Sequence, residues 1–407
     1  MSRKQVFYQK NLRDGGLCRA VPCMCATGVE RDMDQRILLA TPHMSDEGFE
    51  LAYVHDAFEK NWIAPLGENV NQFEALLGTY LGKENIVALS SGTSALHLAM
   101  VQAGVGKDDL VFCQDMTFVA SVNPVHYLGA RLVLIDSERG SWNMDPASLE
   151  KAIELYGVPK AVEVVHLCGI PADMDAIRTI CDKHGIALIE DAAEALGATY
   201  HGRKCGTLGD FGTLSFNGNK IITTSGGGAL VCPDRQSAGH VLKLATQARE
   251  NCPWYEHCET GYNYRLSNIS AGIGRGQLQV LPQRLAQKRQ IFDWYSEKLA
   301  DLPLEMQPAL PDTQPNRWLT AIWLQPDCGV TAGYLIDELE KANIEARYMW
   351  KPMHTQPLFA GVPFVYAADE PQSELIFDGG VCLPSGTQMT EADVDRVCGV
   401  IRSLFKK

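Results

Sequence analysis

The chain has 407 residues, 46% of them hydrophobic and 21% charged, so it is long enough for a large core and too apolar to be disordered. Its net charge of −13 argues against nucleic acid as the main partner, because phosphate binding needs a basic surface. Thirteen cysteines, scattered mostly singly, indicate the reduced thiols of a cytoplasmic protein rather than a disulfide framework.

The first 36 residues are basic and lack a periodic apolar pattern, which predicts a loosely ordered extension. Arg19 and Pro22 interrupt the stretch that could have formed a signal-peptide core, so no signal peptide is predicted. Cys18, Cys23 and Cys25 lack the matched second pair of known zinc sites, so no metal is expected there. No stretch of the chain approaches the roughly 20 apolar residues of a membrane span, so no membrane partner is expected.

From residue 85 onward, short apolar runs alternate with segments of helical periodicity. This alternation predicts parallel β-α-β units, and hence one large mixed sheet covered by helices. In one of the helical segments, Met174, Ile177, Ile180 and Cys181 fall on a single face. The predicted strands cover residues 85–89, 109–113, 131–136, 161–167 and 187–191.

Three features follow the ends of these predicted strands. Asp191 ends the last strand, Phe118 comes soon after the second, and the segment SSGTSALHL (90–98) connects the first to a helix. In sheets of this kind, ligands bind at the carboxyl ends of the strands. Hydroxyl side chains at a helix start form a site for an anion, although serine, threonine and aspartate are also ordinary helix caps.

One lysine stands in SFNGNKIITTSGGGALV (215–231), between a predicted strand and three glycines. Ile221 and Ile222 follow Lys220, and no acidic residue occurs in the next ten positions, so we expect an apolar, partly enclosed setting. Such a setting disfavours the charged amine and makes it more available for imine formation and proton transfer. The alternative is a surface lysine that opens a hairpin.

The C-terminal third is predicted to form a smaller domain, residues 286–407, after a large domain of residues 37–285. It should end in an amphipathic helix with Val394, Val397, Ile401 and Leu404 on one face. Before that helix, the block RYMWKPMH combines basic and aromatic side chains that could meet a nucleotide diphosphate and its base; a solvated charged edge is the alternative. The basic residues of this block are Arg347, Lys351 and His354.

Together, the helix start, Asp191 and Lys220 supply the groups that pyridoxal phosphate (PLP) requires. The helix start would take the phosphate, the carboxylate would pair with the protonated pyridine nitrogen, and the lysine would form the Schiff base. A dinucleotide-binding loop explains these residues less well, because no G-x-G-x-x-G follows the first clear strand.

From about residue 37 to the C-terminus, the sequence resembles the DegT/DnrJ/EryC1/StrS family of sugar aminotransferases. The resemblance implies PLP and an α/β fold of type I, with a large mixed, mostly parallel sheet, helices on both faces and a smaller C-terminal α/β domain. The matching blocks, in family order, are NWIAPLG (61–67), SSGTSALHLA (90–99), EDAAEALG (190–197), SFNGNKIITTSGGG (215–228), ARENCPWYEH (248–257), GYNYRLSN (261–268), WKPMHTQPLF (350–359) and CLPSGT (382–387).

The resemblance also implies roles for single residues. Lys220 is the expected Schiff-base lysine, Asp191 the partner of the pyridine nitrogen, and Phe118 the aromatic residue stacked on the ring. Glu194 matches a position near the ring where relatives often carry glutamine. The implied phosphate ligands are Thr93, Ser94, Ser215 and, from a neighbouring subunit, Asn263, so a homodimer with shared sites is expected.

Within the family, the chain is most similar to enzymes that use L-glutamate to aminate C4 of a UDP-linked 4-keto-6-deoxy-N-acetylglucosamine in bacillosamine synthesis for protein glycosylation. Another nucleotide ketosugar (3-keto, or dTDP- or GDP-linked) is an alternative, and so is a non-catalytic sensor, against which the pairing of Asp191 with Lys220 argues. A dehydratase of this fold is disfavoured because such relatives replace the lysine by histidine.

The chain departs from the family pattern at residues 225–228, where it has Ser-Gly-Gly-Gly and many relatives have Gly-Glu-Gly-Gly. The expected substrate contacts are Trp62, Asn219, Arg265, Arg347, Lys351 and His354.

Overall fold

A computed structural model of the chain describes residues 35–405. The predicted N-terminal extension, with its three cysteines, lies almost wholly outside the described residues. The ten cysteines within them carry free thiols. None of the helices in the described residues has the length and apolar character needed to cross a membrane.

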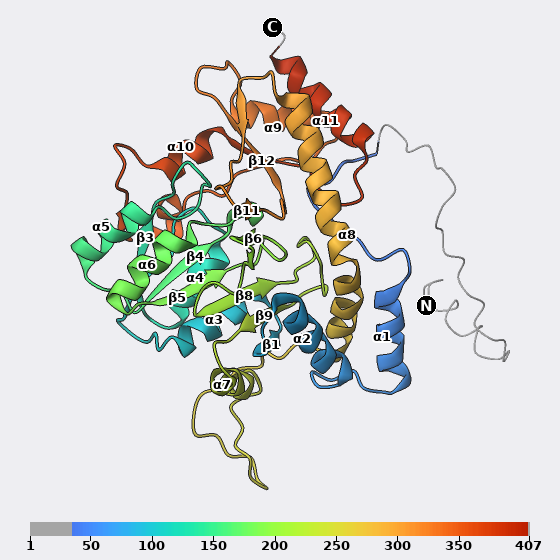
Figure 1. Cartoon of the computed structure of the whole chain (residues 1–407), viewed down its shortest axis with the longest axis vertical. Helices are drawn as coiled ribbons and strands as arrows, with labels where there is room; N and C mark the ends of the chain where they lie inside the picture. The colour runs from blue at the N-terminus through green and yellow to red at the C-terminus, as the bar shows by residue number, and fades with distance from the viewer. Residues whose placement is uncertain (1–34, 406–407) are drawn as a thin grey trace, which may run out of the picture. The chain divides into compact units, whose positions relative to one another are not determined.

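An eight-stranded mixed sheet lies at the centre of the unit formed by residues 36–407 (Figure 1). Six neighbouring strands, from β8 to β14, pair in parallel, while β9 pairs antiparallel with both β8 and β1. Because β9 reverses the direction on both sides, β1 runs the same way as the parallel strands, and their carboxyl ends share one edge. The spatial order is β1 (Ile86–Leu89), β9 (Gly228–Val231), β8 (Phe211–Ser215), β5 (Ala187–Asp191), β4 (Ala161–Val165), β2 (Leu110–Gln114), β3 (Arg131–Ile135) and β14 (Phe364–Val365).

The five predicted strands are confirmed to within two residues at each end, as is the predicted fold class. The place of β1 differs from a simple β-α-β series, because β1 lies at an edge and pairs with β9 rather than with β2. The strand β9 begins at Gly228, in the glycine run after Lys220. The lysine therefore lies in the connection between two adjacent antiparallel strands.

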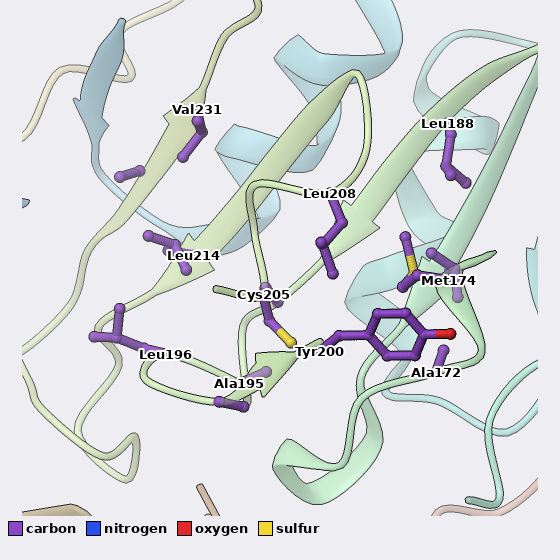
Figure 2. Packing of buried hydrophobic residues seen from close by; sticks show 14 of the residues in the cluster. Ala172, Met174, Leu188, Ala195, Leu196, Tyr200, Cys205, Leu208, Leu214 and Val231 are labelled. Carbon is purple, nitrogen blue, oxygen red and sulfur yellow. The ribbon is translucent and has the colours of Figure 1, made fainter. Parts of the chain in front are cut away.

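Helices cover both faces of this sheet. Side chains alternate between the two faces along each strand, and the strands are buried at nearly every position, so both faces need a cover. In β5, Leu188 packs into the cluster under one set of helices and Ile189 into the cluster under the other. Figure 2 shows part of the first cluster, including Leu188, Leu208 and Leu214. The first face is covered by α2 (Glu68–Leu81), α5 (Pro146–Tyr156), α6 (Met174–His184) and α8 (Asn268–Leu299), and the second by α3 (Gly92–Gln102), α4 (Val119–Tyr127) and α7 (Arg235–Ala245).

Two predicted helix faces are confirmed by burial. Met174, Ile177, Ile180 and Cys181 of α6 are all buried in the first cluster. In α11 (Glu391–Leu404), the predicted valines and isoleucine are buried and Leu404 packs partly against them.

The C-terminal part adds a four-stranded antiparallel sheet that packs against α9, α11 and the end of α8. Helix α8 also packs against α1 (Phe49–Glu59) and α2 near its start, as Figure 1 shows. The predicted boundary after residue 285 falls inside α8, so the division into two domains stays a prediction. The small sheet has the order β10 (Leu304–Met306), β12 (Thr320–Leu324), β15 (Gly380–Leu383), β13 (Arg347–Tyr348), and α9 (Ala332–Lys341) and α10 (Gln372–Gly379) flank it.

The remaining elements are short. Within residues 35–405, a separate three-stranded sheet packs against the first cluster through Tyr200, and three turns of 3-10 helix occur in connecting segments. These elements are β11 (Thr313–Gln314), β6 (Thr199–Tyr200), β7 (Arg203–Lys204), η1 (Leu167–Gly169), η2 (Met353–Thr355) and η3 (Pro357–Phe359).

Candidate active site

A cavity of about 390 Å³ opens at the carboxyl ends of β1, β2, β5 and β8. Its walls come from the start of α3, the start of α4, the segment after β5 and the loop between β8 and β9, with two tryptophans from the C-terminal part. It therefore gathers segments that lie far apart in the sequence. Seven predicted site residues line it: Thr93, Phe118, Asp191, Glu194, Ser215, Asn219 and Lys220.

Helix α3 presents its first turn to this cavity. The hydroxyl of Ser91 accepts a hydrogen bond from the N–H of Ser94 at 3.0 Å, and the Ser94 hydroxyl lies 2.8 Å from that of Ser91. The N–H groups of Gly92 and Thr93 belong to the first turn, where an α-helix offers no acceptor of its own. A Cβ on Gly92 would lie 3.1 Å from Ser215 Cβ, so the glycine lets the strand end approach the helix start. The arrangement fits a phosphate group.

Asp191 is fixed by two donors at the end of β5. Its Oδ2 accepts from the Ser121 hydroxyl at 2.8 Å, and its Oδ1 accepts from the Ala193 N–H at 3.0 Å. The Ser121 hydroxyl in turn lies 2.7 Å from that of Thr117. Ser121 was not among the predicted site residues; its position four residues after Thr117, on the first turn of a helix, was the available signal. A carboxylate oriented in this way fits a protonated ring nitrogen.

The setting of Lys220 is enclosed, as predicted, but it is not purely apolar. Only 13% of the side chain is exposed, and its Nζ lies 3.6 Å from Glu194 Oε1 and 4.1 Å from the centre of the Trp318 ring. The prediction of an apolar setting was therefore wrong, because it considered only neighbours in sequence, whereas the carboxylate comes from the segment after β5. Lys220 thus has one charged and one aromatic neighbour.

Glu194 is itself buried and anchored. Its Oε2 accepts from the Cys168 N–H at 2.7 Å. Burial raises the pKa of the Glu194 carboxyl above its ordinary value, while the nearby Lys220 charge and the Cys168 N–H oppose the rise. Glu194 is thus an acid that takes up a proton more readily than an exposed glutamate, beside the amine of Lys220.

Two tryptophans complete the walls, and neither was predicted as a site residue. The Trp318 indole N–H donates to the Asn219 carbonyl at 2.7 Å, next to Lys220 in the chain. The Trp350 ring lies 5.4 Å from the half-exposed ring of Phe118. Trp350 belongs to a block that resembles the family, whereas no signal in the sequence marked Trp318.

Several predicted residues lie outside the cavity. The buried Arg265 guanidinium pairs with Glu74 and donates to the Ala88 carbonyl at 3.1 Å, so it links α2 to β1 instead of facing the cavity. Trp62 lines a different cavity, of about 380 Å³, near α1 and α2. Asn263 is exposed, and its Oδ1 accepts from Gln247 Nε2 at 3.1 Å.

His354 does not face the cavity either. Its Nδ1 lies 2.8 Å from Asp115 Oδ2 and its Nε2 lies 3.1 Å from Glu374, while the ring stacks on Phe364 at 3.8 Å between centres. Burial lowers the pKa of His354, but the bonds and charges of Asp115 and Glu374 outweigh this effect and raise it overall. Both ring nitrogens are engaged, so the expected substrate contact is replaced by a structural role.

Arg347 lines a neighbouring cavity of about 490 Å³, which shares Asn219, Trp318 and Trp350 with the first. There its guanidinium pairs with Glu345 at 2.8 Å. Lys351 is exposed and lines neither cavity. Within residues 35–405, no group of three or more His, Cys, Asp or Glu side chains could hold a metal ion.

The fold and the cavity together define an enzyme of the PLP-dependent aminotransferase class. The chain belongs to the DegT/DnrJ/EryC1/StrS aminotransferase family, whose sequence profile matches residues 44–402. This confirms the predicted family and its cofactor, PLP, which the helix start, Asp191 and Lys220 are suited to hold.

Known relatives extend along nearly the whole chain. EpsN of Bacillus subtilis, assigned as a PLP-dependent aminotransferase, is 47% identical over 92% of this chain and 97% of its own. The GDP-perosamine synthase of Caulobacter vibrioides is 37% identical over 90% of this chain and 97% of its own. The crystal structure of DesI with its TDP-sugar product matches with a TM-score of 0.82 and 25% identity, over 91% of this chain and 94% of DesI.

Proposed function

We propose that the chain transfers the amino group of L-glutamate to the ketone of a nucleotide-linked 4-keto-6-deoxy sugar, so that glutamate is released as 2-oxoglutarate and the sugar as an amino sugar. The observation that carries the proposal is the single cavity that holds Lys220 Nζ, the Asp191 carboxylate and the first turn of α3. When bound, PLP supplies an electron sink for the carbanion formed at the substrate carbon.

In this proposal, each group of the chain has one task. The first turn of α3 holds the phosphate, and Asp191, oriented by Ser121, keeps the ring nitrogen protonated. Lys220 Nζ takes the proton from the α carbon of glutamate and later returns a proton to the sugar carbon. The two tryptophans exclude water on the side of the C-terminal part.

The neighbouring cavity offers a place for the nucleotide. Arg347, Tyr348 and Trp350 line it, and it adjoins the first cavity through shared walls. Arginine binds phosphate oxygens well and aromatic rings stack on bases, so this cavity suits a nucleotide diphosphate whose sugar reaches Lys220. We place the contact of Arg347 there.

For the nucleotide, we propose a UDP-linked 4-keto-6-deoxy-N-acetylhexosamine, based on the eight sequence blocks described above, and a cytoplasmic site of action. A GDP-linked ketosugar is the second candidate, because the GDP-perosamine synthases of three bacteria are 32–37% identical to this chain. The two candidates differ in the base and in the acetamido group.

Purified enzyme, glutamate and a panel of UDP-, GDP- and dTDP-linked ketosugars should therefore give one preferred amino sugar by mass spectrometry. We expect the UDP-linked acetamido sugar to be converted with the highest kcat/KM. Preferred conversion of a GDP-linked sugar would replace the first candidate by the second. No conversion of any sugar would overturn the proposed function.

We further propose a homodimer in which Asn263 reaches the phosphate site of the partner subunit. Within its own chain, Asn263 is exposed and does not line the cavity around Lys220. An exposed asparagine also occurs in ordinary turns, so the alternative is a purely local role beside Gln247.

Mixing two inactive variants separates these alternatives. A Lys220→Ala chain and an Asn263→Ala chain, exchanged into heterodimers, should regain about half the wild-type activity per heterodimer, because one of the two shared sites then carries neither change. Heterodimers counted by native mass spectrometry without regained activity would assign Asn263 to its own subunit. The Lys341→Ala chain, altered at an exposed lysine, serves as the control partner.

A further inference from the structure

Helix α8 carries a buried lysine that the proposed reaction does not use. Lys288 is 3% exposed, and its Nζ donates to the carbonyl of Trp318 at 2.7 Å and to the carbonyl of Ser385. Within residues 35–405, no carboxylate forms an ion pair with Lys288, and burial lowers its pKa to about 7. A buried amine without a counter-charge is costly, so its presence here calls for a role.

One of the two residues whose carbonyls Lys288 binds, Trp318, contacts Lys220. Trp318 lies with its ring 4.1 Å from Lys220 Nζ, and its indole N–H donates to the carbonyl of Asn219. On the other side, the Ser385 hydroxyl accepts from the Thr320 N–H at 2.8 Å. Lys288 and Lys220 also line one small cavity of about 10 Å³. Lys288 thus fixes the backbone that carries the indole.

We propose that Lys288 is a positioning residue for Lys220, acting through Trp318. By binding the Trp318 carbonyl, it holds the indole face against the nitrogen of Lys220. An aromatic face stabilises a nearby cation, so this contact favours the protonated nitrogen of Lys220 over the neutral one. The inference depends on the established cofactor and on Lys220 as its attachment point, which is part of the proposed function.

The chemistry of the amine explains why a lysine is suited to this place. A neutral amine has two N–H donors and an ammonium has three, so either form satisfies both carbonyls. The hydrogen bond from Lys288 to the Trp318 carbonyl therefore forms both below and above pH 7. In a Lys288→Met variant, the methionine fills about the same space but donates no hydrogen bond to the carbonyls of Trp318 and Ser385.

The test is a double-mutant cycle read from the visible absorbance of bound PLP, which reports the proton on the Lys220 nitrogen. Lys288→Met should move the midpoint of the absorbance change to lower pH by about half to one unit, the size expected from losing a cation–ring contact. Trp318→Leu should give a shift of similar size. The double variant should shift no further than Trp318→Leu alone, because both changes remove one contact.

Turnover should follow the same pattern, with kcat lowered roughly three- to tenfold and KM for glutamate little changed. The other titratable groups around Lys220, which are Glu194, Asp191, the Cys168 thiol and His43 of the small cavity, are not substituted in any of these variants. Lys298→Met is the matched control, since Lys298 lies on the same helix and pairs with Glu391 at the surface.

Additive shifts, or a wild-type midpoint in Lys288→Met, would overturn the proposal. If Lys288→Met does not fold, Lys288→Gln takes its place; its shorter amide does not reach both carbonyls, so a wild-type midpoint there would equally overturn it. The absorbance cycle needs no sugar substrate. Failure of the sugar panel and failure of this inference are therefore separate results.

Discussion

Replacing Lys220 by alanine should lower turnover by roughly 10⁴-fold, the largest effect expected from any single change in the cavity. The variant loses both the covalent attachment of the cofactor and the base that moves the substrate proton. PLP should still bind, because the first turn of α3 and Asp191 remain in place. The measurement is steady-state turnover together with the amount of PLP retained after gel filtration.

Borohydride reduction supplies the matching structural readout. In the wild type, it should fix PLP to the peptide that contains Lys220, and in the Lys220→Ala variant it should fix none. The Lys341→Ala variant, changed at an exposed lysine paired with Glu338, should behave as the wild type does. Label on a different lysine in the wild type would show that the attachment point is misassigned.

The second large effect is expected for Asp191→Asn, at roughly a hundredfold or more in kcat, the scale of removing one electrostatic stabiliser. Without the carboxylate, the ring nitrogen is less protonated and the electron sink is weaker. Folding should be largely retained, because the asparagine oxygen still accepts from the Ala193 N–H and its amide can donate to Ser121. Turnover and the melting temperature are measured on the same preparation.

Ser121→Ala is the matched control for this prediction. It keeps the carboxylate and removes only one of the two donors that orient it, so we expect a smaller loss of kcat. Near-normal turnover in a folded Asp191→Asn variant would show that another group protonates the ring nitrogen.

The central sheet could be predicted because its signals are local. Each strand is a short buried apolar run followed by a helix with one apolar face, as in α6, where the side chains that pack under the sheet recur at helical spacing. The antiparallel pairing of β9 with β1 could not be predicted in this way. Pairing between strands far apart in sequence depends on packing that no local pattern encodes.

The candidate site likewise has a part that local sequence patterns predict and a part that depends on packing between distant segments. That Asp191 and the serine-rich helix start share a cavity could be predicted, because the carboxyl ends of the strands in such a sheet meet at one edge. Glu194 was expected near the ring from the family resemblance, but its contact with the Lys220 amine depends on how two loops pack and was not predicted. Arg265 and His354 show the converse: basic side chains that looked available for substrate are used in ion pairs and hydrogen bonds of the fold.

If the chain transfers the amino group of glutamate as we propose, that group should pass to the PLP-bound enzyme before it reaches the sugar. The direct measurement loads the PLP-bound enzyme with ¹⁵N-glutamate, removes all free amino acid by rapid desalting, and then adds the ketosugar chosen from the panel. We expect about one ¹⁵N-labelled amino sugar per active site, detected by mass spectrometry, and none from the Lys220→Ala variant. Labelled sugar that forms only while free glutamate is present would contradict passage of the amino group through the enzyme.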